Sequence, residues 1–98
     1  MPIYVTLLQF TEKGILHVKD TVKRSEAYRK RAKKHGATVK EIIWTQGGHD
    51  IVTIVEAPDD ETASAFILSA DELLGNVRSE TLRGFTAAEM EELLAKVD

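Results

Sequence analysis

The chain has 98 residues, no cysteine and a formal net charge of -3. A chain of this length is expected to form one domain over residues 1–98, and the lack of cysteine excludes disulfides and thiolate metal sites. No apolar run approaches the ~18 to 20 residues of a membrane span, and the N-terminus lacks the regions of a signal peptide, so we expect a cytoplasmic protein with no membrane partner.

The charged residues divide the chain into two halves. Nine of the thirteen Lys and Arg lie between Lys19 and Lys40, whereas eleven of the sixteen Asp and Glu lie from Glu56 onward. A basic segment is compatible with an anion or nucleic-acid surface, but long basic side chains on the exposed face of a helix are more often solvated. We therefore interpret this segment as a solvated helix face.

The first predicted elements are a strand and a helix. Residues 3–10 are nearly continuously apolar, which is typical of a central strand covered on both faces. A helical pattern then extends from Thr11 to His35 and ends at Gly36. Gly14 and Asp20 each offer a break, so one continuous helix and two shorter pieces both stay open. The residues expected to face the sheet are Val18, Val22, Ser25, Tyr28, Arg29 and Ala32.

Two further runs, Val39 to Thr45 and Ile51 to Ala57, predict a second and a third strand. Gly47 and Gly48 lie between them. We expect the two glycines to form a tight hairpin turn, because such a turn needs positive φ angles that glycine adopts at little cost.

This turn sets the register of the hairpin. Trp44 is expected opposite Ile51, with Trp44 and His49 on one face and Asp50 on the other. We predict a structural role for Asp50, because a carboxylate beside glycine-rich backbone is well placed to accept N–H hydrogen bonds. Together, Gly47, Gly48 and Asp50 form the predicted structural motif of the turn.

The second half predicts a helix, a strand and a last helix. Pro58 to Glu61 combine a strand end with capping carboxylates, and the helix that follows is expected to run to Leu74. Residues 77–85 alternate well enough for a fourth strand, and Thr86 to Glu89 predict a capping box. The expected buried faces are Thr62, Ala65, Phe66, Ser69 and Leu73 in the first helix, and Met90, Leu93, Leu94 and Val97 in the second.

The order βαββαβ followed by an extra helix predicts an α+β fold, the ferredoxin-like plait. With right-handed crossovers, such a chain forms a four-stranded antiparallel sheet with both long helices on one face. The other face stays uncovered and would expose a large apolar patch. We therefore expect a second identical sheet to cover it, giving a homodimer or a larger homo-oligomer. The last helix is expected either to reach across to the partner or to close the end of the barrel.

Several stretches of the chain resemble the GYD domain family, and together they cover nearly the whole chain. At His49 the chain lacks the tyrosine that gives the family motif its middle letter, so an aromatic ring is retained without a phenol hydroxyl. The resemblance implies a fold similar to the dimeric α+β barrels, in which two sheets face each other, and implies no defined biochemical function. The matching stretches are Tyr4 to Leu7, Phe10-Thr11, Gly14-Ile15, Trp44-Thr45, Gly48, Asp50, Glu56 to Glu61, Gly75 to Arg78 and Glu80 to Arg83.

Two classes of function fit these residues. In the first, the chain is a homo-oligomeric module that binds a small organic ligand, or serves assembly, with a cavity between facing sheets. The residues expected to line that cavity are Tyr4, Thr6, Trp44, His49, Thr53 and Arg83.

In the second class, the chain is a cofactor-independent enzyme, monooxygenase-like or isomerase-like, acting on a small organic substrate. His49 would then be the acid or base, because an imidazole pKa of about 6.5 suits proton transfer near neutrality. Arg83 would hold an anionic group of the substrate. A pocket containing both residues favours this class, and a cavity filled by apolar side chains favours the first.

Other chemistries lack their usual sequence features. His49 and Asp50 project to opposite faces of a strand and no third ligand lies nearby, so we expect no metal site. Residues 50–56 lack the aromatic side chains on which RNA-recognition modules stack bases, so we expect no nucleic-acid partner. There is no phosphate-binding glycine loop or nucleophile elbow, and we expect no cofactor.

Overall fold

The computed structural model describes residues 1–69 and 75–98, and in this part of the chain four antiparallel strands form a sheet in the order β2-β3-β1-β4. Their bounds are Ile3–Phe10 for β1, Thr38–Trp44 for β2, Ile51–Glu56 for β3 and Val77–Gly84 for β4. Each agrees with a predicted strand to within a residue. The strand order is that of the ferredoxin-like plait, so the predicted α+β fold is confirmed.

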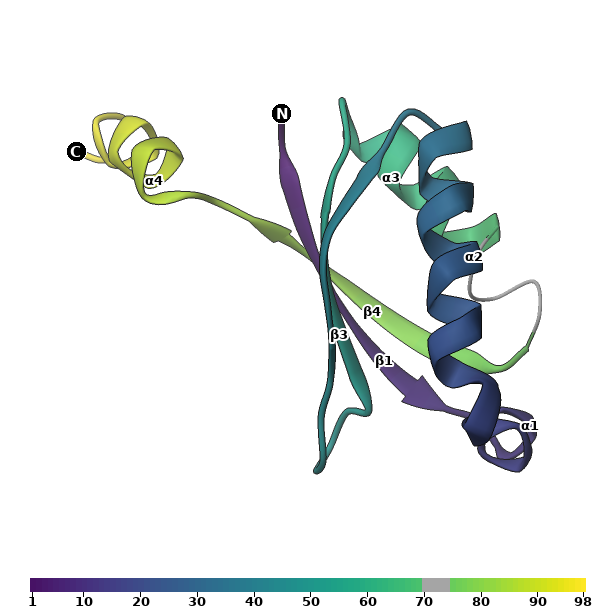
Figure 1. The fold of residues 1–98 in the computed structure, drawn as a ribbon. Coiled ribbons are helices and arrows are strands. Elements are labelled where there is room, and N and C mark those ends of the chain that lie inside the picture. The colour runs from purple at the N-terminus through teal and green to yellow at the C-terminus, as the bar shows by residue number, and fades with distance from the viewer. Residues whose placement is uncertain (70–74) are drawn as a thin grey trace.

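Two helices, α2 and α3, cover one face of this sheet, as Figure 1 shows with the sheet seen nearly edge-on. The helix bounds are Glu12–Leu16 for α1, Thr21–Lys34 for α2, Asp60–Ile67 for α3 and Ala87–Leu94 for α4, with a short 3₁₀ helix at Val18–Asp20. The predicted first helix is therefore interrupted. Thr11 caps α1 by accepting a hydrogen bond from the Gly14 backbone N–H at 3.1 Å.

The hydrophobic core lies between the two helices and the sheet. Strand β1 alternates, with Tyr4, Thr6 and Leu8 buried and the residues between them less so. Phe66 of α3 is fully buried, and its ring centroid lies 4.9 Å from that of Tyr28 on α2. Burying such side chains supplies most of the stability of a small domain. The sheet face covered by α2 and α3 therefore contributes most to the stability of the fold.

The hairpin register is the predicted one. Trp44 pairs with Ile51 and Ile42 pairs with Thr53, with an irregularity further along β2. Gly47 has a φ of +124°, whereas Gly48 does not have a positive φ, so the prediction of left-handed backbone is wrong for Gly48. The connection uses several bent residues after Trp44, and one left-handed glycine is sufficient to reverse it.

On α2, Ser25, Tyr28 and Ala32 face the sheet as predicted, whereas Val22 does not, and the buried face of α3 differs from the predicted one. Val22 is 59% exposed, because α2 turns polar and basic side chains toward the sheet instead. On α3, Phe66 is buried as expected, but Ala65 is exposed and Ala63 and Ile67 are buried. The face is rotated by about one residue, which places the larger Ile67 in the core. The predicted helix end at Leu73 and Leu74 lies outside the described residues.

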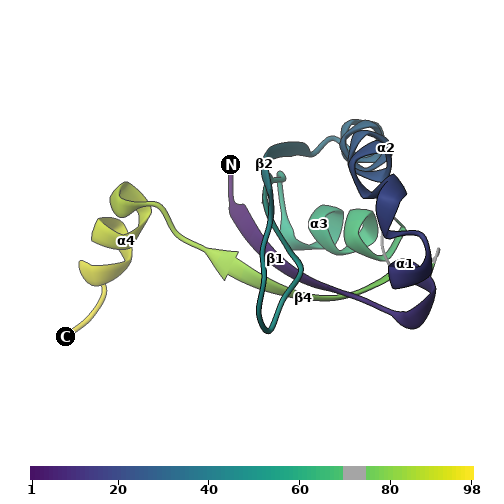
Figure 2. The same ribbon diagram turned by 60° about the horizontal axis from the view of Figure 1, so that its bottom comes forward.

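The last helix, α4, stands apart from the rest of the chain. Its predicted capping box is present, with Thr86 Oγ1 accepting from the Glu89 N–H and the Glu89 carboxylate accepting from the Thr86 N–H. Figures 1 and 2 both show α4 projecting from the end of β4, on the side of the sheet opposite to α2 and α3. Its apolar residues Met90, Leu94 and Val97 are 41%, 53% and 62% exposed.

Candidate functional site

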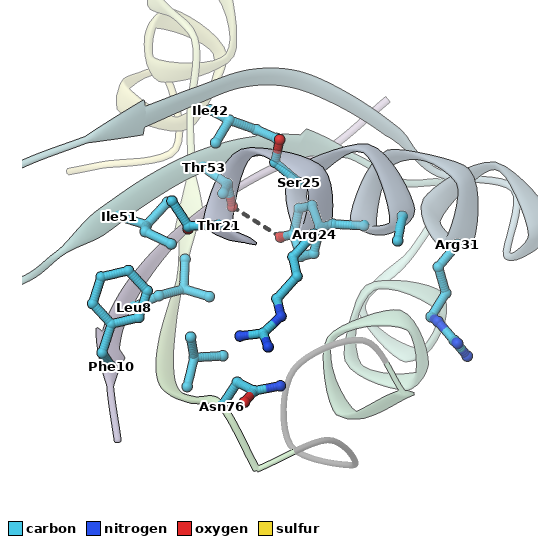
Figure 3. Close-up of a pocket in the computed structure, with 13 residues that line it drawn as sticks. Leu8, Phe10, Thr21, Arg24, Ser25, Arg31, Ile42, Ile51, Thr53 and Asn76 are labelled. Carbon is cyan, nitrogen blue, oxygen red and sulfur yellow. Dashed lines mark hydrogen bonds between the residues drawn. The ribbon is translucent and has the colours of Figure 1, made fainter. Parts of the chain in front are cut away.

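A cavity of about 130 Å³ lies between α2 and the covered face of the sheet. Its floor is apolar and comes from four strands, with α2 as its roof (Figure 3). The apolar lining residues are Leu8, Phe10, Ile42, Ile51 and Val77, joined by Ala27 of α2. An apolar hollow with few polar groups is the usual form of a small-molecule site.

The hydroxyl groups of the lining are already engaged with the protein. The Tyr28 hydroxyl and Thr53 Oγ1 lie 3.0 Å apart and share a hydrogen bond. Thr21 Oγ1 accepts from the Trp44 indole N–H at 3.0 Å, and Ser25 Oγ donates to a carbonyl of its own helix at 2.5 Å. The Tyr28–Thr53 and Trp44–Thr21 bonds tie α2 to the sheet, and each hydroxyl of the lining already has one partner within the protein.

Two other polar groups of the lining are not engaged in this way. Arg24 is half-buried, and Figure 3 shows its side chain reaching from α2 across the cavity, while Arg31 points away. Within residues 1–69 and 75–98, the Arg24 guanidinium has no hydrogen-bond or ion-pair partner. Asn76 lines the cavity near the end of the Arg24 side chain. Its buried Oδ1 accepts no hydrogen bond from the residues that the structure describes. The cavity therefore holds a cationic donor and an amide acceptor that remain available.

The loop between β2 and β3 is tied to the neighbouring strand β1. Asp50 Oδ2 accepts a hydrogen bond from the Phe10 backbone N–H at 2.8 Å, and the Asp50 N–H donates to the Leu8 carbonyl at 2.8 Å. The Gln9 side chain donates to the Gly48 carbonyl at 2.6 Å. Asp50 thus makes the kind of bond predicted for it, although the donor lies on β1 rather than in the glycine loop.

A second polar group lies at the other end of the covered face. The Tyr4 hydroxyl donates to Asp60 Oδ1 at 2.5 Å, and Arg83 Nε lies 3.9 Å from the same oxygen. The Arg83 guanidinium also lies over the Tyr4 and Phe85 rings, at 5.6 and 4.7 Å from their centroids. Burial, followed by the hydrogen bond to Asp60, raises the pKa of Tyr4 to about 12. This phenol is therefore protonated at neutral pH and serves as a donor.

The structure corrects where the predicted ligand residues lie. Tyr4, Thr6 and Thr53 are buried beneath the helices, so they cannot line a cavity between two facing sheets. Thr53 lines the cavity under α2, while Tyr4 and Arg83 line a separate open hollow beside α3. Trp44 lies at the edge of the sheet with its indole bonded to α2. The error arises because residues 3–10 are apolar on both faces, so their pattern does not reveal which face meets the helices.

The two candidate catalytic residues are not brought together. Tyr4 pairs with both Val55 and Arg83 across the sheet, whereas His49 precedes β3 at its opposite end. At a rise of about 3.3 Å per residue, this separates His49 from Arg83 by roughly 20 Å along the strands. No cavity found among the described residues is lined by both.

The uncovered face of the sheet is apolar at its centre. We call this surface the open face. Pairing places one residue of β1 between one of β3 and one of β4 on this side, as with Val5 between Ile54 and Leu82. Ile43 and Leu82 are 49% and 46% exposed. The open face comprises Ile3, Val5, Leu7, Ile43, Val52, Ile54 and Leu82, with Glu41, Glu56 and Glu80 around it.

Sequence reasoning did not find Arg24 or Asn76. Thr21, Arg24, Ser25 and Tyr28 recur at spacings of three and four residues, which places them on one face of α2. The signal was present, but Arg24 belongs to a run of basic residues that was interpreted as solvated. Asn76 lies just after the predicted helix, and no local pattern distinguishes it from a residue of the connecting loop.

Residues 1–69 and 75–98 lack the features of two other kinds of site. They contain no group of three or more His, Cys, Asp and Glu side chains arranged to hold a metal ion. None of their helices combines the length and apolar character needed to cross a membrane.

Three solved structures show the same fold. MtbAldR superposes with a TM-score of 0.69 at 12% identity, over 87% of this chain and 53% of its own, so this chain spans about half its length. FFRP-DM1 superposes with a TM-score of 0.61 at 16% identity, over 87% of this chain and 100% of its own. TTHA0845 from Thermus thermophilus superposes with a TM-score of 0.58 at 23% identity, over 89% of this chain and 96% of its own. At these identities the likeness concerns the fold.

The amino-acid sequence was also compared with curated proteins and with protein families. No curated protein matches it. The family described as the GYD domain matches over residues 4–94, which is almost the whole chain and leaves out only the first residue of β1 among the described strands. The chain therefore belongs to the GYD domain family.

Proposed function

We propose that the chain is a homo-oligomeric module that binds a small organic ligand in the cavity between α2 and the sheet. One observation carries the assembly part of this proposal. The sheet is covered by helices on one side only, and its open face presents a continuous apolar centre. An uncovered apolar sheet face is costly in water, and an identical face is its simplest cover.

The size of this surface supports a stable dimer. Four strands of about seven residues project as a rectangle of roughly 20 by 20 Å, from the usual strand spacing and rise. Side-chain relief and the exposed stripe of α4 add to this projection. Together they approach the about 800 Å² per partner that specific interfaces bury. The face would thus be covered by the partner sheet, with α4 clasping its edge.

A charge placed at the centre of the open face tests the assembly. Ile54→Arg should abolish the dimer, because the arginine would be buried against an apolar surface. Val22→Arg is the matched control, since Val22 is 59% exposed on α2, away from the open face. Sedimentation velocity of both variants is the measurement. A dimer that survives Ile54→Arg would contradict the proposed interface.

The ligand part of the proposal depends on the cavity under α2. Its volume of about 130 Å³ is close to the ~150 Å³ of an apolar cavity that binds benzene. Benzene, followed by the amide chemical shifts of the full-length protein, is therefore a suitable neutral probe. We expect shifts at the lining residues. Ser25→Leu should fill the cavity and remove them, whereas Lys23→Leu on the same helix should not, and no response in the parent protein would exclude a ligand cavity.

We do not propose the enzyme alternative, because His49 and Arg83 lie at opposite ends of the sheet. Their roles as candidate catalytic residues stay predictions. A cytoplasmic location and the absence of cofactor, nucleic-acid and membrane partners are likewise predictions from the sequence alone.

A further inference from the structure

The polar lining of the cavity under α2 shows what kind of ligand it would select. Its hydroxyl groups bond to one another, to the backbone of α2 or to the Trp44 indole. The charged donor in the middle of the cavity is the guanidinium of Arg24 (Figure 3). A ligand that enters therefore meets the apolar side chains of the strands and the positive charge of Arg24.

The position of Arg24 is unusual for an arginine on a basic helix. A solvated arginine extends into water, and several residues of α2 do so, among them Lys23 and Lys30, which are exposed. Arg24 instead turns inward between α2 and the sheet, where it has no carboxylate partner among the described residues. A half-buried guanidinium without an acceptor is unfavourable, and an anion that enters the cavity would supply the acceptor.

We propose that the cavity selects small monocarboxylates whose apolar body is about the size of a benzene ring, with Arg24 binding the carboxylate. This inference rests on the proposed ligand-binding function and specifies its ligand class. The cavity volume sets the size of the apolar body. The planar guanidinium fork sets the preference for a carboxylate, because it can donate two parallel N–H hydrogen bonds to the two oxygens. The basic surface of α2 favours the approach of an anion.

Benzoate and benzamide test this inference, because they have nearly the same shape and differ in charge. Titration calorimetry of the full-length protein should show benzoate binding at least about tenfold more tightly, which corresponds to about 1.4 kcal/mol. Arg24→Gln should reduce benzoate affinity to that of benzamide, and Arg24→Lys should retain part of the preference. Lys23→Gln removes an equal charge from an exposed position of the same helix and should leave the preference intact.

The outcomes separate the two proposals. Equal affinities for benzoate and benzamide in the parent protein would overturn the carboxylate selectivity and leave the cavity as a neutral binding site. A benzoate preference that persists in Arg24→Gln would also overturn it, because the selective charge would then lie elsewhere. If neither probe binds and benzene shifts no lining amide, the proposed ligand-binding function itself fails. The comparison of benzoate with benzamide needs no variant, so it stands even if Arg24→Gln does not fold.

Discussion

The two faces of the sheet have opposite characters within one small chain. The covered face is packed with Tyr4, Leu8 and Phe66 beneath two helices and contains the cavity under α2. The open face carries isoleucine, valine and leucine side chains without a cover from α2 or α3, and α4 projects beyond it. The difference indicates a division of roles. In our proposal the covered face stabilises the fold and binds the ligand, whereas the open face and α4 are used in assembly.

Truncating one large side chain on each face gives the strongest test of this division. Phe66→Ala should lower the free energy of unfolding by about 3–5 kcal/mol, because Phe66 is fully buried and its loss leaves a cavity. Leu82→Ala, on the open face, should mainly shift the dimer toward the monomer. Urea unfolding at one fixed protein concentration measures the first effect and sedimentation velocity measures the second, since unfolding of a dimer depends on concentration in every variant. A Leu82→Ala protein that unfolds as easily as Phe66→Ala and stays fully dimeric would contradict the proposed division.

The loop between β2 and β3 sharpens the comparison, because hydrogen bonds join it to β1. Gly47→Ala should cost about 1–3 kcal/mol, since Gly47 has a φ of +124° that L side chains rarely adopt. Gly48→Ala is the control. Its φ is not positive and no atom lies within 4 Å of an added Cβ, so we expect an effect below about 1 kcal/mol. Thermal unfolding should show a larger loss of stability for Gly47→Ala than for Gly48→Ala. The reverse order would mean that Gly48, not Gly47, adopts the backbone conformation that requires glycine.

Asp50→Asn should lower the free energy of unfolding by about 1 kcal/mol, because the bond from the Phe10 N–H to Asp50 Oδ2 loses its charged acceptor. The change should not alter benzene or benzoate affinity, since Asp50 does not line the cavity under α2. Chemical unfolding and the same titrations measure both quantities. A loss of affinity at an unchanged unfolding midpoint would mean that Asp50 acts in binding rather than in structure.

The last comparison concerns the pH dependence of stability at Tyr4. Its pKa is raised from 10.0 in the unfolded chain to about 12 in the fold, so the folded state favours the protonated phenol. This contribution is fully present below pH 10 and is lost as the pH rises through the folded pKa. Stability should therefore fall between about pH 10 and pH 12 in the parent protein more than in Tyr4→Phe. Equal slopes in the two proteins, from unfolding curves across this range, would contradict the buried, Asp60-bonded phenol.

The order of elements could be predicted because it depends on strong local signals. The paired runs around Gly47 set the hairpin register, and Thr86 and Glu89 form the predicted capping box. Each signal involves residues close in sequence, so no knowledge of the rest of the fold is needed. The family resemblance, which rests on stretches spread over the chain, is likewise supported by the match over residues 4–94.

The site could not be predicted, because it depends on which face of each element meets the core. Tyr4, Thr6 and Leu8 alternate with Ile3, Val5 and Leu7, and both sets are mostly apolar, so the sequence does not tell the faces apart. On α2 the inward position of Arg24 depends on the space left by Leu8 and Val77, which are distant in sequence. For this reason Tyr4, Thr6 and Thr53 are predicted to line a cavity between two sheets, whereas they lie under the helices.

The mass of the full-length protein in solution tests the central claim most directly. Sedimentation velocity at low micromolar concentration should give a species of twice the 10.9 kDa chain mass or a larger multiple. Removing residues 86–98 should weaken the association and leave the far-ultraviolet spectrum of the sheet, because α4 stands apart from the core described above. A compact 10.9 kDa species from the full-length chain would contradict the account, since the open face would then be stable in water without a partner.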